Sequence, residues 1–280
     1  MKRALCSLSM CLATVTVVCF GFNAHATTIT LGSVKDATLI SDTSSELALG
    51  AAYNIYAGRV GEQGASTLRR GLIQFDFQSI PVGSVVTSVQ LKLYMSQSQG
   101  GTFAVSLKKA TLSWGEGTSF AFGGGGAPAQ PGDATWINRF YPSTPWPILG
   151  GQFSTVTSAT TNVTNVAWYV WGSTAPMVAD VQGWVNQPTT NFGWGVLGNE
   201  VTLQSVKRFE SRQASVNNPQ LIVTFNPPST NPADLNNDGL VNGVDLAILL
   251  GAWNSSNPTA DINDDGIVNG TDLATLLAAW

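Results

Sequence analysis

Two segments near the C-terminus carry oxygen-bearing side chains at the spacing of a calcium-binding loop. Carboxylate and amide oxygens at loop positions 1, 3, 5, 9 and 12, with a backbone carbonyl at position 7, can surround one Ca²⁺, and Gly at position 6 permits the turn. The first predicted set is Asp234, Asn236, Asp238, the carbonyl of Leu240, Asn242 and Asp245. The second is Asp261, Asn263, Asp265, the carbonyl of Ile267, Asn269 and Asp272.

The two loops belong to a repeat. Residues 234–253 and 261–280 are identical at fourteen of twenty positions, and each acidic loop is followed by apolar residues at helical spacing. Each unit is therefore predicted to be a loop followed by a helix. Residues 227–280 hold seven acidic side chains and no Lys or Arg, so this segment needs a counter-cation.

Paired loop-helix units with Asp at position 12 resemble dockerin modules, and the resemblance covers residues 234–280. It implies two bound Ca²⁺ ions and a cohesin-like partner that attaches the chain to a polysaccharide-degrading or cell-surface assembly. Gly243-Val244 and Gly270-Thr271 replace the hydroxyl pairs that are usual in dockerins, and the helices lack basic residues. These departures leave open the type of cohesin, and whether a cohesin binds at all. The alternative is a calcium-stapled cap.

Residues 1–26 have the pattern of a secretory signal peptide, with Lys2 and Arg3 before an apolar stretch and Ala24-His25-Ala26 at the end. All three cysteines and the single histidine fall within it. The mature chain then has no disulfide, no thiol nucleophile, no Ser-His-Asp triad and no His/Cys zinc site. We expect a secreted protein with no other membrane span, and no basic patch for nucleic acid is visible.

Residues 227–233 read as a proline-rich linker between a body at 27–226 and the tail at 234–280. The body alternates apolar and polar residues in short runs, as in Val89–Met95 and Phe103–Lys108, between turn residues. This predicts a mainly β fold, a jelly-roll β-sandwich, followed by a small α-helical domain of paired EF-hand-like units. One short helix is expected at Met177–Trp184.

Four stretches of the body, taken in order, resemble DNRLRE-type domains of secreted bacterial proteins. They are Arg70–Phe77, Asp180–Trp184, Asn191–Trp194 and Arg208–Arg212. The resemblance implies a β-sandwich related to carbohydrate-binding modules and often appended to polysaccharide-active enzymes. It supplies no catalytic set, and it implies that Asp36 serves a structural calcium ion in the body.

The long irregular segment 115–153 is the candidate ligand site of the body. Aromatic rings suit stacking on sugar faces, and polar side chains beside them can bind hydroxyls or a uronate carboxylate. The candidate residues are Asp133, Trp136, Arg139, Tyr141 and Trp146, with the three aromatics expected at the surface. The alternative is that the segment covers a sheet and buries these rings, whereas Trp184 and Trp194 are expected in the core.

Three functions remain open from sequence alone. The first is a non-catalytic carbohydrate-binding accessory protein, docked through the calcium-dependent tail. The second is a glycoside hydrolase or polysaccharide lyase using Asp/Glu or Tyr/Lys, with candidate carboxylates Glu116, Asp133, Glu200 and Glu210. The third is a structural or adhesive surface protein. For Asp76, Glu210 and Arg212 we favour ion pairing inside strands, with Arg70 or Arg208 as partners of the acids.

Overall fold

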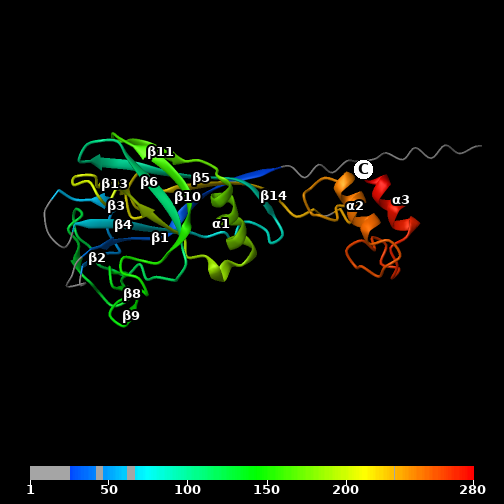
Figure 1. The fold of residues 1–280 in the computed structure, drawn as a ribbon, viewed down its shortest axis with the longest axis horizontal. Coiled ribbons are helices and arrows are strands. Elements are labelled where there is room, and N and C mark those ends of the chain that lie inside the picture. Colours follow the sequence, from blue (N-terminus) through cyan, green and yellow to red (C-terminus); the bar gives the residue numbers. More distant parts are fainter. Residues whose placement is uncertain (1–25, 42–46, 62–66, 230) are drawn as a thin grey trace, which may run out of the picture. The chain divides into compact units, whose positions relative to one another are not determined.

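The computed structural model describes residues 26–41, 47–61, 67–229 and 231–280 (Figure 1). The predicted signal peptide therefore lies outside the described residues, except for Ala26. The described chain forms two compact units, one made by the residues up to Pro228 and one by most of the residues from Ser229 onward. Each unit is described here by itself.

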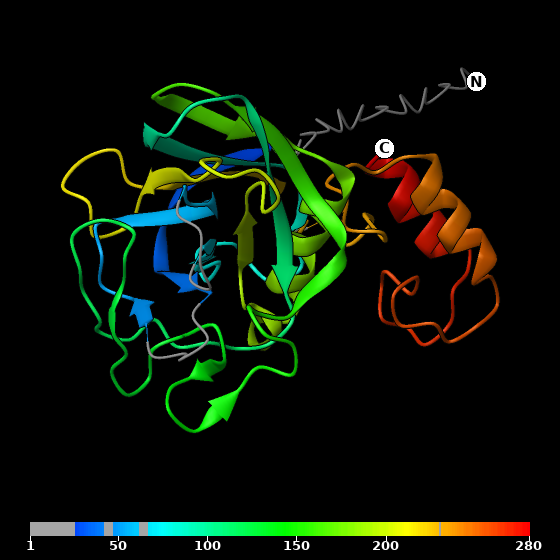
Figure 2. The same cartoon turned by 60° about the vertical axis from the view of Figure 1, so that its left-hand side comes forward.

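Most strands of the body are antiparallel and form two sheets, with β1 and β3 pairing in both (Figures 1 and 2). This confirms a mainly β fold with sandwich-like sheets. The first sheet contains β1 (Thr27–Ile40), β3 (Asn54–Arg59), β5 (Val85–Ser98), β11 (Ala167–Trp171), β13 (Lys207–Glu210) and β14 (Gln220–Asn226). The second contains β1, β2 (Leu47–Leu49), β3, β4 (Leu68–Phe75), β6 (Phe103–Ala110), β7 (Ala127–Pro128), β10 (Phe153–Val163) and β12 (Trp194–Leu197).

The main core lies between the sheets because strand side chains alternate between faces. In β5, Val89, Leu91, Leu93 and Met95 are buried, and the residues between them are more exposed. They join one cluster with apolar side chains from the other sheet, among them Ile73, Val105, Leu107, Trp194 and Val196. The predicted strands at 89–95 and 103–108 lie within β5 and β6, as expected from their period of two.

Helix α1 (Ala175–Asn186) covers one end of this core. Thr174 caps it by accepting a hydrogen bond from the backbone N–H of Met177, and Met177, Val181 and Trp184 are buried at helical spacing. The predicted helix at Met177–Trp184 is confirmed. A single 3₁₀ turn, η1 (Pro188–Thr190), follows. Trp184 and Trp194 are core residues, as predicted, and their rings contact edge to face at 4.7 Å.

The segment 115–153 is largely irregular, as expected, with only β7 and the small hairpin of β8 (Asn138–Phe140) and β9 (Thr144–Pro145). It does not present all its rings. Trp146 is 4% exposed and packs in a second core cluster with Leu39, Leu72 and Trp114. The expectation that Trp146 lies at the surface is therefore wrong, because the segment folds over the second sheet.

The C-terminal unit has two helices, α2 (Gly243–Gly251) and α3 (Gly270–Ala278), each preceded by an acidic loop. Its small core contains Leu235, Leu249, Ala260, Val268 and Leu276. The repeat thus produces two loop-helix units, as the sequence predicts.

Candidate calcium loops and ligand surface

The two acidic loops have the same backbone conformation. Position 4 has a positive φ in both, 56° at Asn237 and 57° at Asp264. Position 6 is Gly239 with φ 89° and Gly266 with φ 95°, a region that favours glycine. The sharp turn that the motif requires is therefore present twice.

The carboxylates at position 12 organise each loop. One oxygen of Asp245 accepts the backbone N–H groups of positions 2 and 3, at 2.8 and 3.2 Å, and the other accepts that of Asn242 at 2.8 Å. Asp272 makes the same three bonds at the same distances. Asn242 and Asn269 cap the helices by accepting from the N–H two residues on.

Burial by itself raises the pKa of Asp272, but the backbone N–H bonds from Asn269, Asn263 and Ile262 outweigh it, so the pKa lies below its ordinary value. The carboxylate therefore stays ionised in mildly acidic solution. A carboxylate has about four lone-pair sites, so these N–H bonds leave acceptor capacity for a cation.

In the second loop, side-chain amide N–H groups face oxygens of the predicted calcium set. The side-chain N–H of Asn263 donates to Asp265 Oδ2 at 3.0 Å, and that of Asn269 donates to the carbonyl of Ile267 at 3.0 Å. These amides turn their positive ends toward two oxygens that the motif assigns to calcium. Asp261 accepts from the backbone N–H groups of Asp265 and Gly266, which holds position 1 against the turn. Oxygen-only ligands are what Ca²⁺ prefers.

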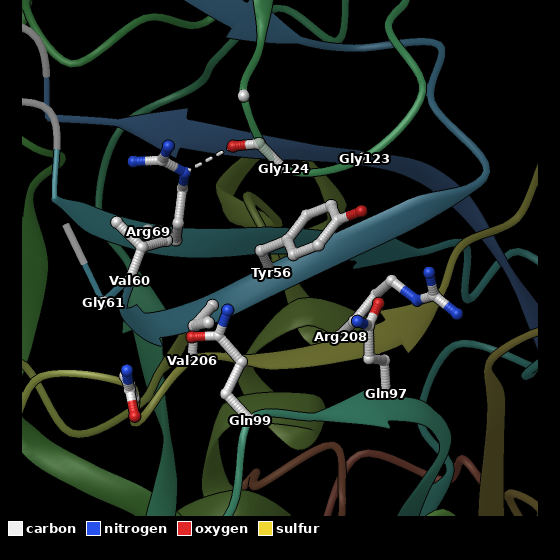
Figure 3. Close-up of a pocket in the computed structure, with 12 residues that line it drawn as sticks. Tyr56, Val60, Gly61, Arg69, Gln97, Gln99, Gly123, Gly124, Val206 and Arg208 are labelled. Atoms are coloured by element: carbon white, nitrogen blue, oxygen red, sulfur yellow. Dashed lines mark hydrogen bonds between the residues drawn. The ribbon is translucent and has the colours of Figure 1, made fainter.

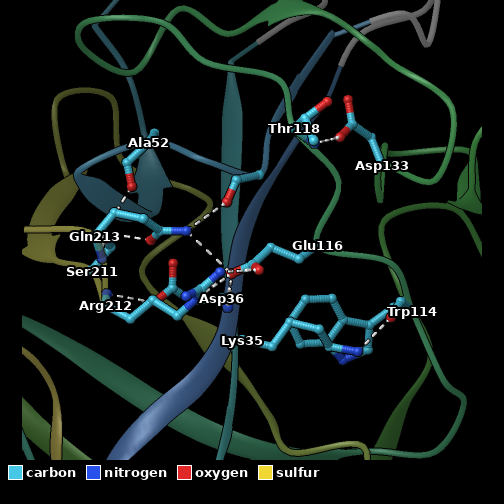
Figure 4. Close-up of polar contacts among 11 residues, drawn as sticks. Lys35, Asp36, Ala52, Trp114, Glu116, Thr118, Asp133, Ser211, Arg212 and Gln213 are labelled. Atoms are coloured by element: carbon cyan, nitrogen blue, oxygen red, sulfur yellow. Dashed lines mark hydrogen bonds and ion pairs between the residues drawn. The ribbon is translucent and has the colours of Figure 1, made fainter.

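Among the described residues, no three His, Cys, Asp or Glu side chains form a metal-binding group by themselves. The predicted sets depend on Asn and carbonyl oxygens as well as carboxylates. In the body, Asp36 lies beside Glu116, whose Oε1 accepts the backbone N–H of Asp36 at 2.9 Å (Figure 4). The cation at this pair is Arg212: its backbone N–H donates to Asp36 at 2.7 Å and its guanidinium forms a forked ion pair with Glu116.

This network has unusual electrostatics. Burial raises the pKa of Asp36 to about 7, more than the backbone N–H of Arg212 lowers it, and the Glu116 charge adds to the rise. Burial also lowers the pKa of Lys35, whose ammonium donates to the carbonyl of Trp114 at 2.6 Å and lies 4.2 Å from its ring centre. A protein cation, Arg212, therefore faces these acids, and the structural calcium ion expected at Asp36 stays a prediction.

Two of the other carboxylates considered for catalysis, Glu200 and Asp133, are bound by protein donors. Glu200 forms a forked ion pair with Arg70 at 2.6 and 2.9 Å. Asp133 is fully buried and accepts backbone N–H groups of Thr118 and Gln130 at 2.8 and 2.6 Å. Structural ion pairing is thus present in the body, but Arg70 pairs with Glu200 rather than with the predicted Asp76 or Glu210.

The five predicted ligand residues of segment 115–153 have different structural environments. Trp146 donates its indole N–H to the carbonyl of Thr135, so both it and Asp133 are internal supports. Trp136 packs partly buried under Arg70, 4.8 Å from its guanidinium, and Arg139 donates to Ser113. Tyr141 is half-buried. The structure does not gather these five side chains around one hollow.

An exposed group of aromatic rings was missed from the sequence. Tyr53, Phe120 and Phe122 form an aromatic cluster, with ring centres 5.3 Å apart for Tyr53 and Phe120 and 4.9 Å apart for the two phenylalanines. Their exposed fractions are 51%, 38% and 85%. Three mutually contacting rings at the surface are unusual, because such rings are ordinarily buried. The sequence indicates tryptophans as candidate surface rings. Tyr53 is remote in sequence from Phe120 and Phe122, so no local pattern indicates the cluster.

A hollow of about 590 Å³ lies next in sequence to this cluster, since Gly123, Gly124 and Gly125 line it (Figure 3). We call it the β13 hollow. Gly124 lies against the ring of Tyr56, where an added Cβ would be 3.1 Å from the ring. The glycine run therefore permits close approach to this ring, in addition to the loop freedom expected from sequence. The remaining lining residues are Tyr56, Val60, Gly61, Arg69, Gln97, Gln99, Gln204, Val206 and Arg208.

A second hollow, of about 420 Å³, lies near α1 and is lined by apolar side chains such as Phe77, Ile80 and Trp184. No helix among the described residues has the length and apolar character needed to cross a membrane.

Comparison with known proteins assigns the C-terminal unit only. Residues 232–279 match the family model of the dockerin type I domain. No curated protein matches the chain, and no family model confirms the DNRLRE-type resemblance of the body. Type I dockerins bind calcium, and the conformation shared by the two loops agrees with this. Over residues 232–279 the C-terminal unit is therefore similar to dockerin type I domains, both in sequence and in its paired loop-helix units.

Proposed function

We propose that this protein is a secreted, non-catalytic accessory protein with two working surfaces. The dockerin domain holds two Ca²⁺ ions and docks to a cohesin module, and the β-sandwich body binds polysaccharide. The observation that supports polysaccharide binding is the exposed aromatic cluster, whose Phe122 directly precedes Gly123 in the lining of the β13 hollow.

The C-terminal unit has exposed apolar residues at equivalent positions of its two repeats, and this supports docking to a partner. Leu250 and Leu277 occupy equivalent positions of the two units and are 51% and 53% exposed. Trp253 and Trp280 are also equivalent and exposed. Calcium would be held by the twelve loop groups predicted from the sequence, and would neutralise an acidic segment without Lys or Arg. With its ions bound, the domain presents matching apolar residues on both helices to a partner.

The body supports carbohydrate binding through the arrangement of its aromatic cluster. Flat apolar faces with polar edges stack on sugar rings, and a neighbouring polar hollow supplies hydrogen bonds to hydroxyls. Phe122 is 85% exposed, so its ring adds little to the stability of the body. A ring held at the surface without a packing role is available for a ligand.

An enzyme is the competing function. The carboxylates brought together in the described body are Asp36 and Glu116, and Arg212 lies against both. They line neither of the hollows described above. This geometry favours a structural network, although the raised pKa of Asp36 is of the kind seen in acid catalysts.

Polysaccharide retention separates these functions. The purified protein is incubated in Ca²⁺ with insoluble and gel-embedded plant and algal polysaccharides, and both retention and the release of reducing ends or unsaturated products are measured. Retention without product supports the proposal, and product release indicates an enzyme. Phe122→Ala should lose at least half of the retention with an unchanged Tm, whereas Ile148→Ala, a matched change at another exposed apolar residue, should retain it. No retention on any polysaccharide would favour a structural or adhesive protein.

A further inference from the structure

We infer that the β13 hollow is a binding site for a negatively charged sugar unit, one that carries a carboxylate or a sulfate ester. This inference rests on the proposed carbohydrate binding and adds its specificity. The aromatic cluster then stacks on a neighbouring unit of the same chain.

Strand register builds the floor of the hollow. Arg208 in β13 is paired with Tyr56 in β3 on one side and with Gln97 in β5 on the other. Directly paired residues of neighbouring strands project to the same face, so these three side chains lie side by side. Their neighbours Ile55 and Phe209 are buried in the main core. The hollow is thus on the opposite face of the sheet, and Figure 3 shows Gln97, Tyr56 and Arg208 around it.

The charge of the hollow selects the ligand. Arg208 is a cation in its lining, and none of the described lining residues is acidic. Among the described residues no carboxylate lies within ion-pairing distance of Arg208, whose guanidinium donates to the hydroxyl and carbonyl of Ser96. A guanidinium without a carboxylate partner, in a concave site, is suited to forked hydrogen bonds with a planar carboxylate or with sulfate oxygens.

The other polar groups fit a sugar rather than a lone anion. Gln97 and Gln99 are exposed side-chain amides, each able to donate to and accept from hydroxyl groups. Arg69 is held in place by donating to the carbonyl of Gly124 at 2.7 Å. The volume of about 590 Å³ lies within the range of about 300–1,000 Å³ that is usual for ligand sites. A ring bearing one charge and several hydroxyls matches this lining.

The test compares polysaccharides that differ in charge. Retardation of the full-length protein in native gels is measured with a polyuronate, a sulfated galactan and an uncharged glucan embedded in the gel. We expect retardation by one or both anionic polymers that weakens as NaCl is raised, because salt screens the arginine charges. Comparison of the polyuronate with the sulfated galactan identifies whether a carboxylate or a sulfate ester is bound.

Two matched pairs of variants locate the site. Gln97→Glu places a negative charge in the hollow and should weaken anionic binding about tenfold or more, whereas Gln187→Glu, the same change at another exposed glutamine, should not. Arg208→Gln should weaken it to a similar extent, and Lys92→Gln, which removes one charge from the same sheet, should not. Gln97 is exposed, so its variant keeps the test valid if Arg208→Gln fails to fold.

The outcomes separate this inference from the function on which it rests. Retention on the uncharged glucan alone would overturn the anionic site and leave carbohydrate binding intact. Anionic binding that Gln97→Glu and Gln187→Glu change equally would also overturn it. No retention on any of the three polymers would count against both.

Discussion

The buried carboxyl of Asp36 predicts an unusual dependence of stability on pH. Its pKa is raised from 3.8 to about 7, chiefly by burial, in a network with Glu116 and Arg212. Between about pH 4 and pH 7 the folded body therefore holds a proton that the unfolded chain has released. In this window the contribution of Asp36 to the free energy of unfolding falls as pH rises, by about 1.4 kcal/mol per pH unit.

The perturbation that tests this is Asp36→Asn. Asparagine keeps an oxygen for the backbone N–H of Arg212 but cannot ionise. We expect the free energy of unfolding of the variant, relative to the parent, to increase by about 2 kcal/mol between about pH 5 and about pH 7, and to level off above that. The assay is urea unfolding in Ca²⁺ at a series of pH values, followed by fluorescence of the buried body tryptophans.

Asp76→Asn is the matched control, because Asp76 is an exposed carboxylate that accepts the N–H of Gln78. A difference that arises from burial of the carboxyl should be absent from this variant, because Asp76 is exposed. An Asp36→Asn difference that does not change with pH, or that decreases as pH rises, would mean that burial does not raise the pKa of Asp36.

Three further predictions follow from the packing and from the loops. Trp146→Ala should destabilise the body by about 3–5 kcal/mol in urea unfolding, because the ring fills the second core cluster; a loss below about 1 kcal/mol would mean that the ring is not packed. Replacing Asp245 or Asp272 by Ala should reduce the helix signal in circular dichroism and weaken Ca²⁺ binding in calorimetry, and unchanged binding would contradict the loop assignment. Residues 27–226 expressed alone should unfold cooperatively, and a molten product would contradict the separate units.

The sequence predicted those features that depend on local pattern. The period of two in Val89–Met95 identified β5, and the spacing of Met177, Val181 and Trp184 identified α1. The calcium loops were visible because each ligand set lies within twelve consecutive residues and occurs twice. Local spacing was therefore sufficient for the strands, the helices and the dockerin.

Features that depend on long-range pairing were not predicted. The β13 hollow exists because β13 lies between β3 and β5, strands far from it in sequence. The aromatic cluster brings Tyr53 to Phe120 and Phe122. Whether an aromatic ring in a proline-rich loop is exposed also depends on which part of the fold the loop packs against. Trp146 donates its indole N–H to the carbonyl of Thr135, and no local sequence pattern predicts this hydrogen bond.

In the proposed function, one chain links a polysaccharide to a cohesin through calcium. Co-sedimentation tests this link: an insoluble polysaccharide that retains the protein is pelleted together with a purified type I cohesin module. We predict that the cohesin pellets only when the protein and Ca²⁺ are both present. A chelator should release the cohesin while the protein stays in the pellet, because the β-sandwich body binds the polysaccharide. A cohesin that stays in the supernatant in Ca²⁺ while the protein pellets would show that the chain does not dock to it, and one that remains in the pellet after chelation would show that docking does not need calcium.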